Sequence, residues 1–140
     1  MKIILMGQQA FGKSTLEKFY KETDHEIVAV YCAPDKEGKP LDPVKEYALN
    51  ENLPVFQPSN FKDKEVLDQM RSHNSDLCVM AYVTIFVPEE ARDIPQHGSI
   101  CFHPSLLPLH RGPSSINWPI SLGSKKTGLT IFYPNDGLDE

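Results

Sequence analysis

The sequence has few cysteines and no cysteine pair that predicts a disulfide framework or a zinc site. Its 140 residues include three cysteines, Cys32, Cys78 and Cys101, and no Cys-x-x-Cys motif. Each cysteine lies in an apolar stretch, so we expect three free thiols that pack as small apolar side chains. An odd number of cysteines also argues against a disulfide-rich secreted domain.

Long apolar runs and an excess of positive charge are also missing. No run approaches the roughly 20 residues that cross a bilayer, and the apolar stretch at residues 1–7 lacks the cleavage site of a signal peptide. Lys and Arg number 14 against 19 Asp and Glu, which gives a net charge of -5. We therefore expect a cytoplasmic protein with no membrane partner, and the charge disfavours nucleic acid as a partner.

Apolar stretches alternate with segments of helical spacing along the whole chain. The stretches that predict strands are 2–6, 27–32, 54–57, 77–82, 99–103 and 127–133, and the predicted helices are 13–20, 43–50, 62–72, a short one from Pro88, and 114–122. This order predicts one α/β domain over residues 1–140, with a Rossmann-like, mostly parallel sheet and helices on both faces. Ligands of such sheets bind beyond the carboxyl ends of the strands.

Three of the predicted helices carry signals at their starts. Asp42 followed by Pro43 is typical of an N-cap and a first helical position. Asn60 is a candidate cap for the helix over 62–72. Pro88, followed by two glutamates, is expected at the first position of a short helix.

Residues 7–14, Gly-Gln-Gln-Ala-Phe-Gly-Lys-Ser, match the phosphate-loop pattern G-x-x-x-x-G-K-[ST]. In a nucleotide-binding protein, backbone amides would hold the phosphates, Lys13 would reach them and Ser14 would bind magnesium. The alternative is an ordinary strand-to-helix turn, in which Gly7 and Gly12 allow close packing. No later strand ends in a clear Walker-B aspartate and a G-x-G-x-x-G motif is absent, so we expect Lys13 to be exposed and to bind no phosphate.

A histidine ends the predicted strand over 99–103, at the edge of the sheet where ligands bind. His103 precedes Pro104, which favours extended backbone, and Asp136 and Asp139 follow the next predicted strand. If the two strands are neighbours, a carboxylate there would orient the imidazole and form an acid/base pair. A purely structural histidine is the other interpretation. A G-x-S-x-G motif is absent, so we do not expect Ser105 to be a nucleophile.

Residues 98–112, Gly-Ser-Ile-Cys-Phe-His-Pro-Ser-Leu-Leu-Pro-Leu-His-Arg-Gly, with Ile-Asn-Trp at 116–118, resemble the 10-formyltetrahydrofolate-dependent formyltransferase family. The second half of this signature is Asp-Gly-Leu-Asp at 136–139, and residues 7–12 and 34–36 also look like family positions. The resemblance therefore covers the whole chain. It is greatest to the hydrolase domain of 10-formyltetrahydrofolate dehydrogenase and its bacterial relatives, with methionyl-tRNA formyltransferases more distant.

The resemblance implies an enzyme of one-carbon metabolism, a formyltransferase or hydrolase that acts on 10-formyltetrahydrofolate and needs no metal. It implies catalytic roles for His103, Asp139 and Cys101, and contacts with the folate substrate from Ile85, Phe86, Val87 and Asp139. It also implies a cis peptide bond at Leu107–Pro108. Transferases of the family have Asn at the position of Cys101, and a thiol is a weaker donor than an amide. This difference predicts slow chemistry or water as the acceptor.

The family continues well beyond the point where this chain ends, one residue after Asp139. The resemblance therefore implies an incomplete domain. Three functions stay open: a folate formyl hydrolase or transferase, a phosphate-loop nucleotide-binding protein, and a noncatalytic folate-binding remnant. The formyl acceptor (water, an amine or tRNA) and the oligomeric state are not given by the sequence.

Overall fold

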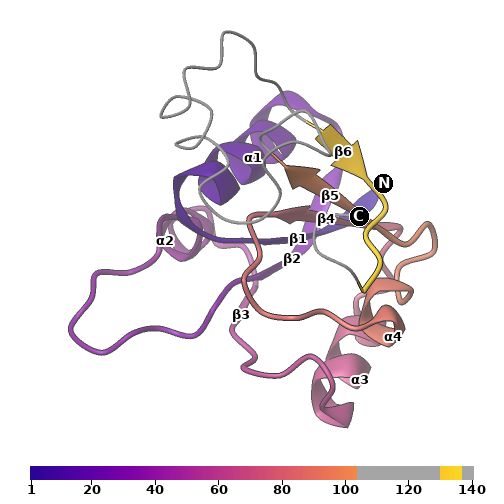
Figure 1. Ribbon diagram of the computed structural model, residues 1–140. Coiled ribbons are helices and arrows are strands. Elements are labelled where there is room, and N and C mark those ends of the chain that lie inside the picture. The colour runs from indigo at the N-terminus through magenta and orange to yellow at the C-terminus, as the bar shows by residue number, and fades with distance from the viewer. Residues whose placement is uncertain (104–129, 137–140) are drawn as a thin grey trace, which may run out of the picture.

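The computed structural model describes residues 1–103 and 130–136, and within them six strands form a single sheet (Figure 1). The strands are β1 (Lys2–Gly7), β2 (Glu26–Tyr31), β3 (Val55–Phe56), β4 (Leu77–Ala81), β5 (Ser99–His103) and β6 (Thr130–Phe132). Their order across the sheet is β3-β2-β1-β4-β5-β6. All neighbouring pairs are parallel except β5 and β6, which are antiparallel. The predicted α/β, mostly parallel sheet is confirmed.

Helices cover both faces of the sheet, as the alternation of the sequence predicts. The helices are α1 (Gln9–Glu22), α2 (Pro43–Asn50), α3 (Lys64–Ser72) and α4 (Glu89–Arg92). Figure 1 shows α1 and α2 on one side of the sheet and α3 and α4 on the other. The central strands are buried by both layers, which explains why their sequences are apolar at nearly every position.

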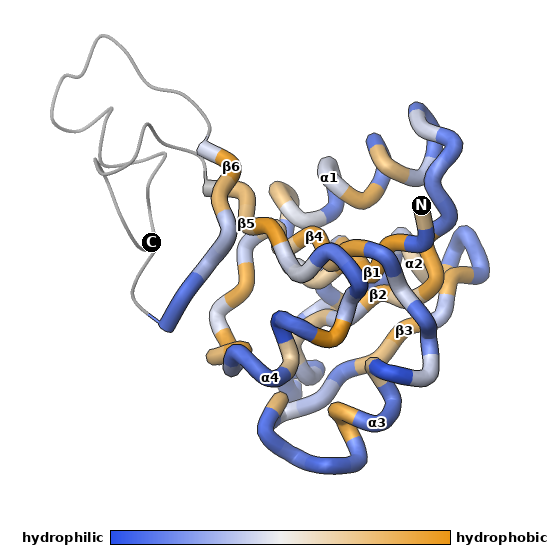
Figure 2. The backbone as a smooth tube through the Cα atoms, turned by 90° about the vertical axis from the view of Figure 1, so that its right-hand side faces the viewer, coloured by the Kyte–Doolittle hydropathy of each residue, from blue (hydrophilic) through white to orange (hydrophobic). Residues whose placement is uncertain are grey.

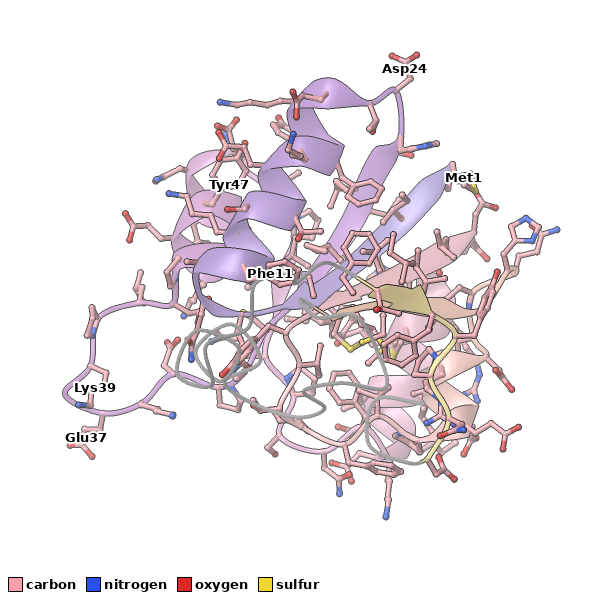
Figure 3. All side chains as sticks on the ribbon, turned by 45° about the horizontal axis from the view of Figure 1, so that its top comes forward. Met1, Phe11, Asp24, Glu37, Lys39 and Tyr47 are labelled. Atoms are coloured by element: carbon pink, nitrogen blue, oxygen red, sulfur yellow. The ribbon has the colours of Figure 1, made fainter. Side chains whose placement is uncertain are left out.

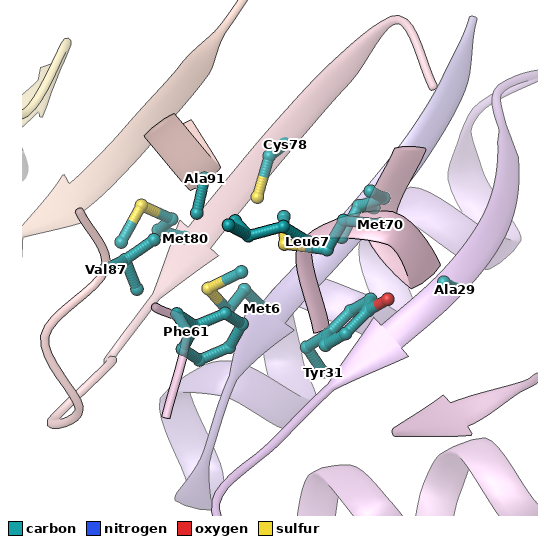
Figure 4. Packing of buried hydrophobic residues seen from close by; sticks show 11 residues of the cluster. Met6, Ala29, Tyr31, Phe61, Leu67, Met70, Cys78, Met80, Val87 and Ala91 are labelled. Atoms are coloured by element: carbon teal, nitrogen blue, oxygen red, sulfur yellow. The ribbon is translucent and has the colours of Figure 1, made fainter. Parts of the chain in front are cut away.

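Two apolar clusters form the core, one on each face of the sheet. The cluster beneath α1 and α2 includes Leu16, Val30 and Val44, and the cluster beneath α3 includes Tyr31 and Met70. Figure 4 shows the second cluster between α3 and the strands, and Figure 2 shows the apolar central strands between more polar helices. None of the three cysteines forms a disulfide, as predicted. Among the described residues no helix is long and apolar enough to cross a membrane.

The starts of the helices differ in detail from the prediction. Asp42 is the N-cap of α2, as expected, and its carboxylate accepts a hydrogen bond from the Val44 amide. The N-cap of α3 is Asp63, so the prediction of Asn60 as the cap is wrong. The Asn60 side chain accepts a hydrogen bond from the Lys62 amide and so forms a turn before the helix, a common alternative for Asn. Pro88 was expected at the first helical position of α4, but it is the N-cap, and the helix begins at Glu89.

The segment between β2 and α2 is a long loop that projects from the sheet, with Glu37 and Lys39 near its tip (Figure 3). Its base is fixed by Asp35, which accepts hydrogen bonds from Lys45 at 2.6 Å and from Gln57 at 2.8 Å. These contacts hold the pKa of the Asp35 carboxyl below its usual value, chiefly through the hydrogen bond from Lys45. These hydrogen bonds tie the start of the loop to α2 through Lys45 and to the segment after β3 through Gln57.

Candidate functional site

The strand order reverses between β1 and β4, because β1 continues to β2 on one side and β4 continues to β5 on the other. Ligands of open α/β sheets bind beyond the carboxyl ends of the strands at such a point. The chain bends sharply there after both strands. Gln9 and Tyr82 have positive φ values of 59° and 64°, which are uncommon for residues other than glycine. Thr84 Oγ1 lies 3.2 Å from Gln8 Oε1 and links the two loops.

A cavity of about 350 Å³ opens beside the loop that follows β4. The described residues that line it come from four parts of the chain: β4 with the loop after it, α4, β5, and β6 with the segment after it. The lining residues are Met80, Val83, Thr84, Ile85, Phe86, Val87, Arg92, Cys101, Phe132, Pro134, Asn135 and Asp136. The side chains from β4 and the loop after it are mostly apolar, and charged or polar side chains gather where Arg92 of α4 meets Asn135 and Asp136 after β6.

The cavity brings together four of the residues that the sequence analysis assigns to the site. Ile85, Phe86 and Val87 form one wall, and Cys101 of β5 lies in another. Phe86 is 51% exposed, whereas Val87 is only 4% exposed and packs into the core. The Lys62 ammonium lies 5.5 Å from the centre of the Phe86 ring. The Phe86 ring is thus available to a ligand, and the Val87 side chain anchors the same wall.

Cys101 lies on β5, between β4 and β6. It pairs with Met80 of β4 on one side and with Phe132 of β6 on the other. All three residues line the cavity, so its floor is apolar apart from the half-buried thiol. A Cys101 thiol placed here can contact a ligand, although it donates only weak hydrogen bonds.

His103 is the last residue of β5, as predicted, and its backbone pairs with Thr130 at the start of β6. Asp139 and the peptide bond at Leu107–Pro108 lie outside the described residues. The sequence argument treated the ends of both strands as meeting at one edge. That argument is wrong for β6, because β6 is antiparallel and its carboxyl end runs back along β5 past Cys101. The pairing of His103 with Asp139 stays a prediction.

Arg92 also lines the cavity, and the sequence analysis did not assign it to the site. Its side chain is 8% exposed, and its Nη1 donates to the carbonyl oxygens of Val87 at 3.0 Å and Asn135 at 3.1 Å. The same nitrogen lies 2.9 Å from Oδ1 of Asp136. No sequence signal marks Arg92, because its partners after β6 are at least 43 positions away.

The packing of α1 explains why residues 7–14 match the phosphate-loop pattern. The amide of Gln9, at the start of α1, donates to both carboxylate oxygens of Asp42. A Cβ atom on Gly7 would lie 2.4 Å from the Ala81 carbonyl oxygen, and one on Gly12 would lie 2.8 Å from a methyl group of Val44. The glycines therefore allow α1 to pack closely on β4 and α2. Lys13 is exposed, as predicted.

Comparison with known proteins supports the resemblance. A family model described as formyl transferase matches residues 1–140. A methionyl-tRNA formyltransferase of Fusobacterium nucleatum is 43% identical over 99% of this chain and 46% of its own length. The mitochondrial 10-formyltetrahydrofolate dehydrogenase of Mus musculus is 41% identical over 99% of this chain and 15% of its own length. The chain thus spans less than half the length of these two relatives.

The two relatives are similarly close, so the expected greater distance of methionyl-tRNA formyltransferases is not confirmed. The fold matches the crystal structure of a phosphoribosylglycinamide formyltransferase from Bacillus halodurans with a TM-score of 0.78. That structure is 21% identical, and the match covers 100% of this chain and 75% of the other. Sequence and fold agree, and the chain belongs to the formyl transferase family.

Proposed function

We propose that this domain binds 10-formyltetrahydrofolate in the cavity beside the loop after β4 and removes or transfers its formyl group. The observation that carries the proposal is the composition of that cavity. Ile85, Phe86 and Val87, which the resemblance assigns to folate, share it with Cys101, two positions before His103. Membership of the formyl transferase family supports the same chemistry. We also expect a cytoplasmic location and a small-molecule folate as the partner.

The cavity suits a flat, partly apolar ligand. Its volume of about 350 Å³ lies within the range of small-molecule sites, which runs from roughly 300 to 1,000 Å³. The exposed ring of Phe86 offers an apolar surface against which an aromatic ring system can pack. Thr84 and Asn135 add polar groups to the lining of the cavity.

The proposed reaction is acyl transfer at the formyl carbon. A nucleophile, water or an amine, attacks this carbon, and the carbonyl electrons move to the oxygen to give a tetrahedral oxyanion. Protonated His103 would stabilise the oxyanion, and Asp139 would orient His103 and take the proton of the nucleophile. The oxyanion electrons then re-form the carbonyl as the bond from carbon to N10 breaks, and N10 receives its proton from His103. With water as the nucleophile the products are formate and tetrahydrofolate.

Cys101 bears on the choice of acceptor. A thiol stabilises an oxyanion less well than an amide, and loss of one such donor costs about 2.7–4 kcal/mol in other enzymes. We therefore propose slow turnover with water as the acceptor. A transfer to tRNA is disfavoured by the net charge of -5.

Calorimetric titration with tetrahydrofolate tests the assigned cavity. Phe86→Ala should weaken binding by about tenfold, because it removes an exposed ring from the wall of the cavity. The matched control is Leu49→Ala, which removes a side chain of similar exposure, 49%, from α2 on the other face of the sheet. Equal affinities for the two variants would contradict this location. Binding without any release of formate would favour the noncatalytic folate-binding remnant.

A further inference from the structure

Arg92 is the only charged side chain among the buried residues in the part of the chain that the structure describes. Burying a guanidinium group is costly unless the group is paired and hydrogen-bonded. Three oxygen atoms meet this requirement at Nη1: the carbonyl oxygens of Val87 and Asn135, at 3.0 and 3.1 Å, and Oδ1 of Asp136, at 2.9 Å. The carbonyl oxygen of Arg92 accepts a hydrogen bond from Ser99 Oγ at 2.8 Å. The backbone of Arg92 and one end of its guanidinium are thus held in place.

The other end of the guanidinium has N–H groups without an acceptor among the described residues. An arginine carries five N–H groups in a planar fork, and every contact that the described residues make with this one uses Nη1. In the same part of the chain, the only fully enclosed side-chain nitrogen or oxygen atoms without a hydrogen-bond partner are Tyr47 Oη and Ser75 Oγ. Nε and Nη2 of Arg92 therefore keep some accessible surface, although the side chain as a whole is only 8% exposed. Because Arg92 lines the cavity, a molecule bound there can accept hydrogen bonds from these two nitrogens.

The charge around Arg92 favours a neutral acceptor over an anionic one. The carboxylate of Asp136 already balances the guanidinium at a distance of 2.9 Å. A carboxylate of the ligand would lie close to Asp136 as well, and like charges brought together at a binding site lower the affinity. A carbonyl oxygen carries no such penalty, and a hydrogen bond that it accepts from a charged donor is stronger than one from a neutral donor.

We propose that Arg92 is a specificity-determining residue of the cavity, which donates a hydrogen bond from Nε or Nη2 to the carbonyl oxygen of the folate's pterin ring. The inference rests on the proposed function. Phe86 offers the ring an apolar surface, and Arg92 then fixes how the ring is turned against that surface. Arg92 lies beside Ser99 at the start of β5, whereas His103 ends the strand, so the two residues meet different parts of one ligand. Arg92 binds the ring and takes no part in bond making or breaking.

Folic acid and aminopterin are a matched pair of probes for this hydrogen bond. They differ only at C4 of the ring and in the hydrogen on the neighbouring N3: folic acid has a carbonyl oxygen at C4, and aminopterin has an amino group. The carbonyl oxygen accepts from Arg92, whereas the amino group presents its own N–H groups to another donor. Calorimetric titration of the parent protein should therefore give an affinity for folic acid about tenfold higher than for aminopterin, or more. Equal affinities for the two probes would overturn the inference.

Arg92→Met tests whether this preference comes from the guanidinium. Methionine keeps an unbranched apolar side chain in the buried position and removes all the N–H groups. The preference for folic acid should fall by about tenfold in this variant, and a general distortion of the cavity would affect both probes alike. The control is Arg71→Met, which removes an arginine that pairs with Glu90 of α4, is 48% exposed and is not among the lining residues. The control should keep the parental ratio of affinities, and the same ratio in Arg92→Met would show that the guanidinium does not read the ring.

Pteroic acid, which is folic acid without its glutamate, tests the alternative that Arg92 binds a carboxylate of the ligand. Arg92→Met should weaken the binding of folic acid and pteroic acid by the same factor. If it weakens folic acid much more, the acceptor is a glutamate carboxylate and the inference is wrong. If Arg92→Met does not fold, Arg92→Lys replaces it, because lysine keeps the positive charge beside Asp136 and lacks the planar fork; it should lower the preference for folic acid several-fold.

Tetrahydrofolate separates a failure of the inference from a failure of the proposed function. If the parent binds tetrahydrofolate and shows no preference between the probes, the inference fails and the proposed function stands. If the parent binds reduced folates only, tetrahydrofolate and tetrahydroaminopterin replace the two probes, with the same expected ratio. If the parent binds no folate of either kind, the proposed function fails and the inference fails with it.

Discussion

Asp42 and Gln9 are joined by two hydrogen bonds, in which the Gln9 amide lies 3.0 Å and 2.9 Å from the two carboxylate oxygens of Asp42. The same carboxylate also caps α2 through the Val44 amide at 2.9 Å. Asp42 thus places a negative charge at the amino end of α1, where a phosphate-loop protein holds a phosphate. The helix end is already occupied by an anion of the protein.

Asp42→Ala should destabilise the protein, because it leaves the amides of Gln9 and Val44 without their acceptor. The loss of a side-chain cap costs about 1–2 kcal/mol in the free energy of unfolding. Urea denaturation followed by circular dichroism measures this quantity. Asp63→Ala is the matched control: Asp63 is the N-cap of α3, but its side chain makes no capping hydrogen bond, and the change should cost less than about 0.5 kcal/mol. Equal losses would show that the hydrogen bonds of Asp42 contribute nothing.

Magnesium-ATP should not bind at residues 7–14. The carboxylate of Asp42 would repel a phosphate at the start of α1, and Lys13 is exposed. Isothermal titration should therefore give no saturable heat at micromolar ATP, with the parent protein and with Lys13→Ala alike. Micromolar binding that disappears in Lys13→Ala would restore the phosphate-loop interpretation.

Gly7→Ala should be more destabilising than Gly38→Ala. The added Cβ at Gly7 meets a backbone oxygen of Ala81 at 2.4 Å, so two strands must move apart, at a cost of about 3 kcal/mol. At Gly38 nothing lies within 4 Å of the added atom, and the only penalty is a φ of +73°, worth roughly 1 kcal/mol. Thermal unfolding of both variants tests this order of stability losses. A smaller loss in Gly7→Ala than in Gly38→Ala would contradict the packing argument.

The fold could be predicted in large part because its strands are marked by apolar runs. Ser99–His103 matches the prediction at both ends, since β5 pairs with β4 on one side and with β6 on the other. The direction of β6 could not be predicted, because alternation of side chains is the same in parallel and antiparallel strands. Its antiparallel pairing places Thr130, the first residue of β6, beside the backbone of His103.

The candidate site was predictable only where local sequence carries the signal. The resemblance pointed to Phe86 and Cys101, and the cavity contains both. Arg92 carries no such signal, because it contacts Asn135 and Asp136, which only the sheet topology brings near. Asn60 shows the opposite error: the residue type fits a cap, but Asp63 lies closer to the start of the helix.

The stability of the protein should fall as the pH is lowered from about 7 to about 5, and His73 should cause part of this fall. The Tyr31 hydroxyl lies 2.8 Å from His73 Nε2. Burial raises the pKa of Tyr31, so the hydroxyl keeps its proton and can donate it to a neutral imidazole that carries its own proton on Nδ1. Burial lowers the pKa of His73 below its ordinary value of about 6.5. Below that pH the unfolded chain therefore binds the proton more readily than the folded protein does.

His73→Gln tests this account, since the amide oxygen of Gln can accept from Tyr31 and does not titrate. Melting temperatures measured at intervals between pH 7 and pH 5 should fall less steeply in this variant than in the parent. His97→Gln, a change at an exposed histidine, serves as the control and should keep the parent slope. A steeper fall of the melting temperature in His73→Gln than in the parent would contradict this account.

The most direct measurement of the central claim is the release of formate from 10-formyltetrahydrofolate by the parent protein and by His103→Ala and Asp139→Ala. We predict slow release by the parent and a loss of at least about 10²-fold in kcat in each variant, because both residues act chiefly in the transition state. Tetrahydrofolate affinity should stay within threefold of the parent in both. Formate release by His103→Ala at the parental rate would contradict the proposed function.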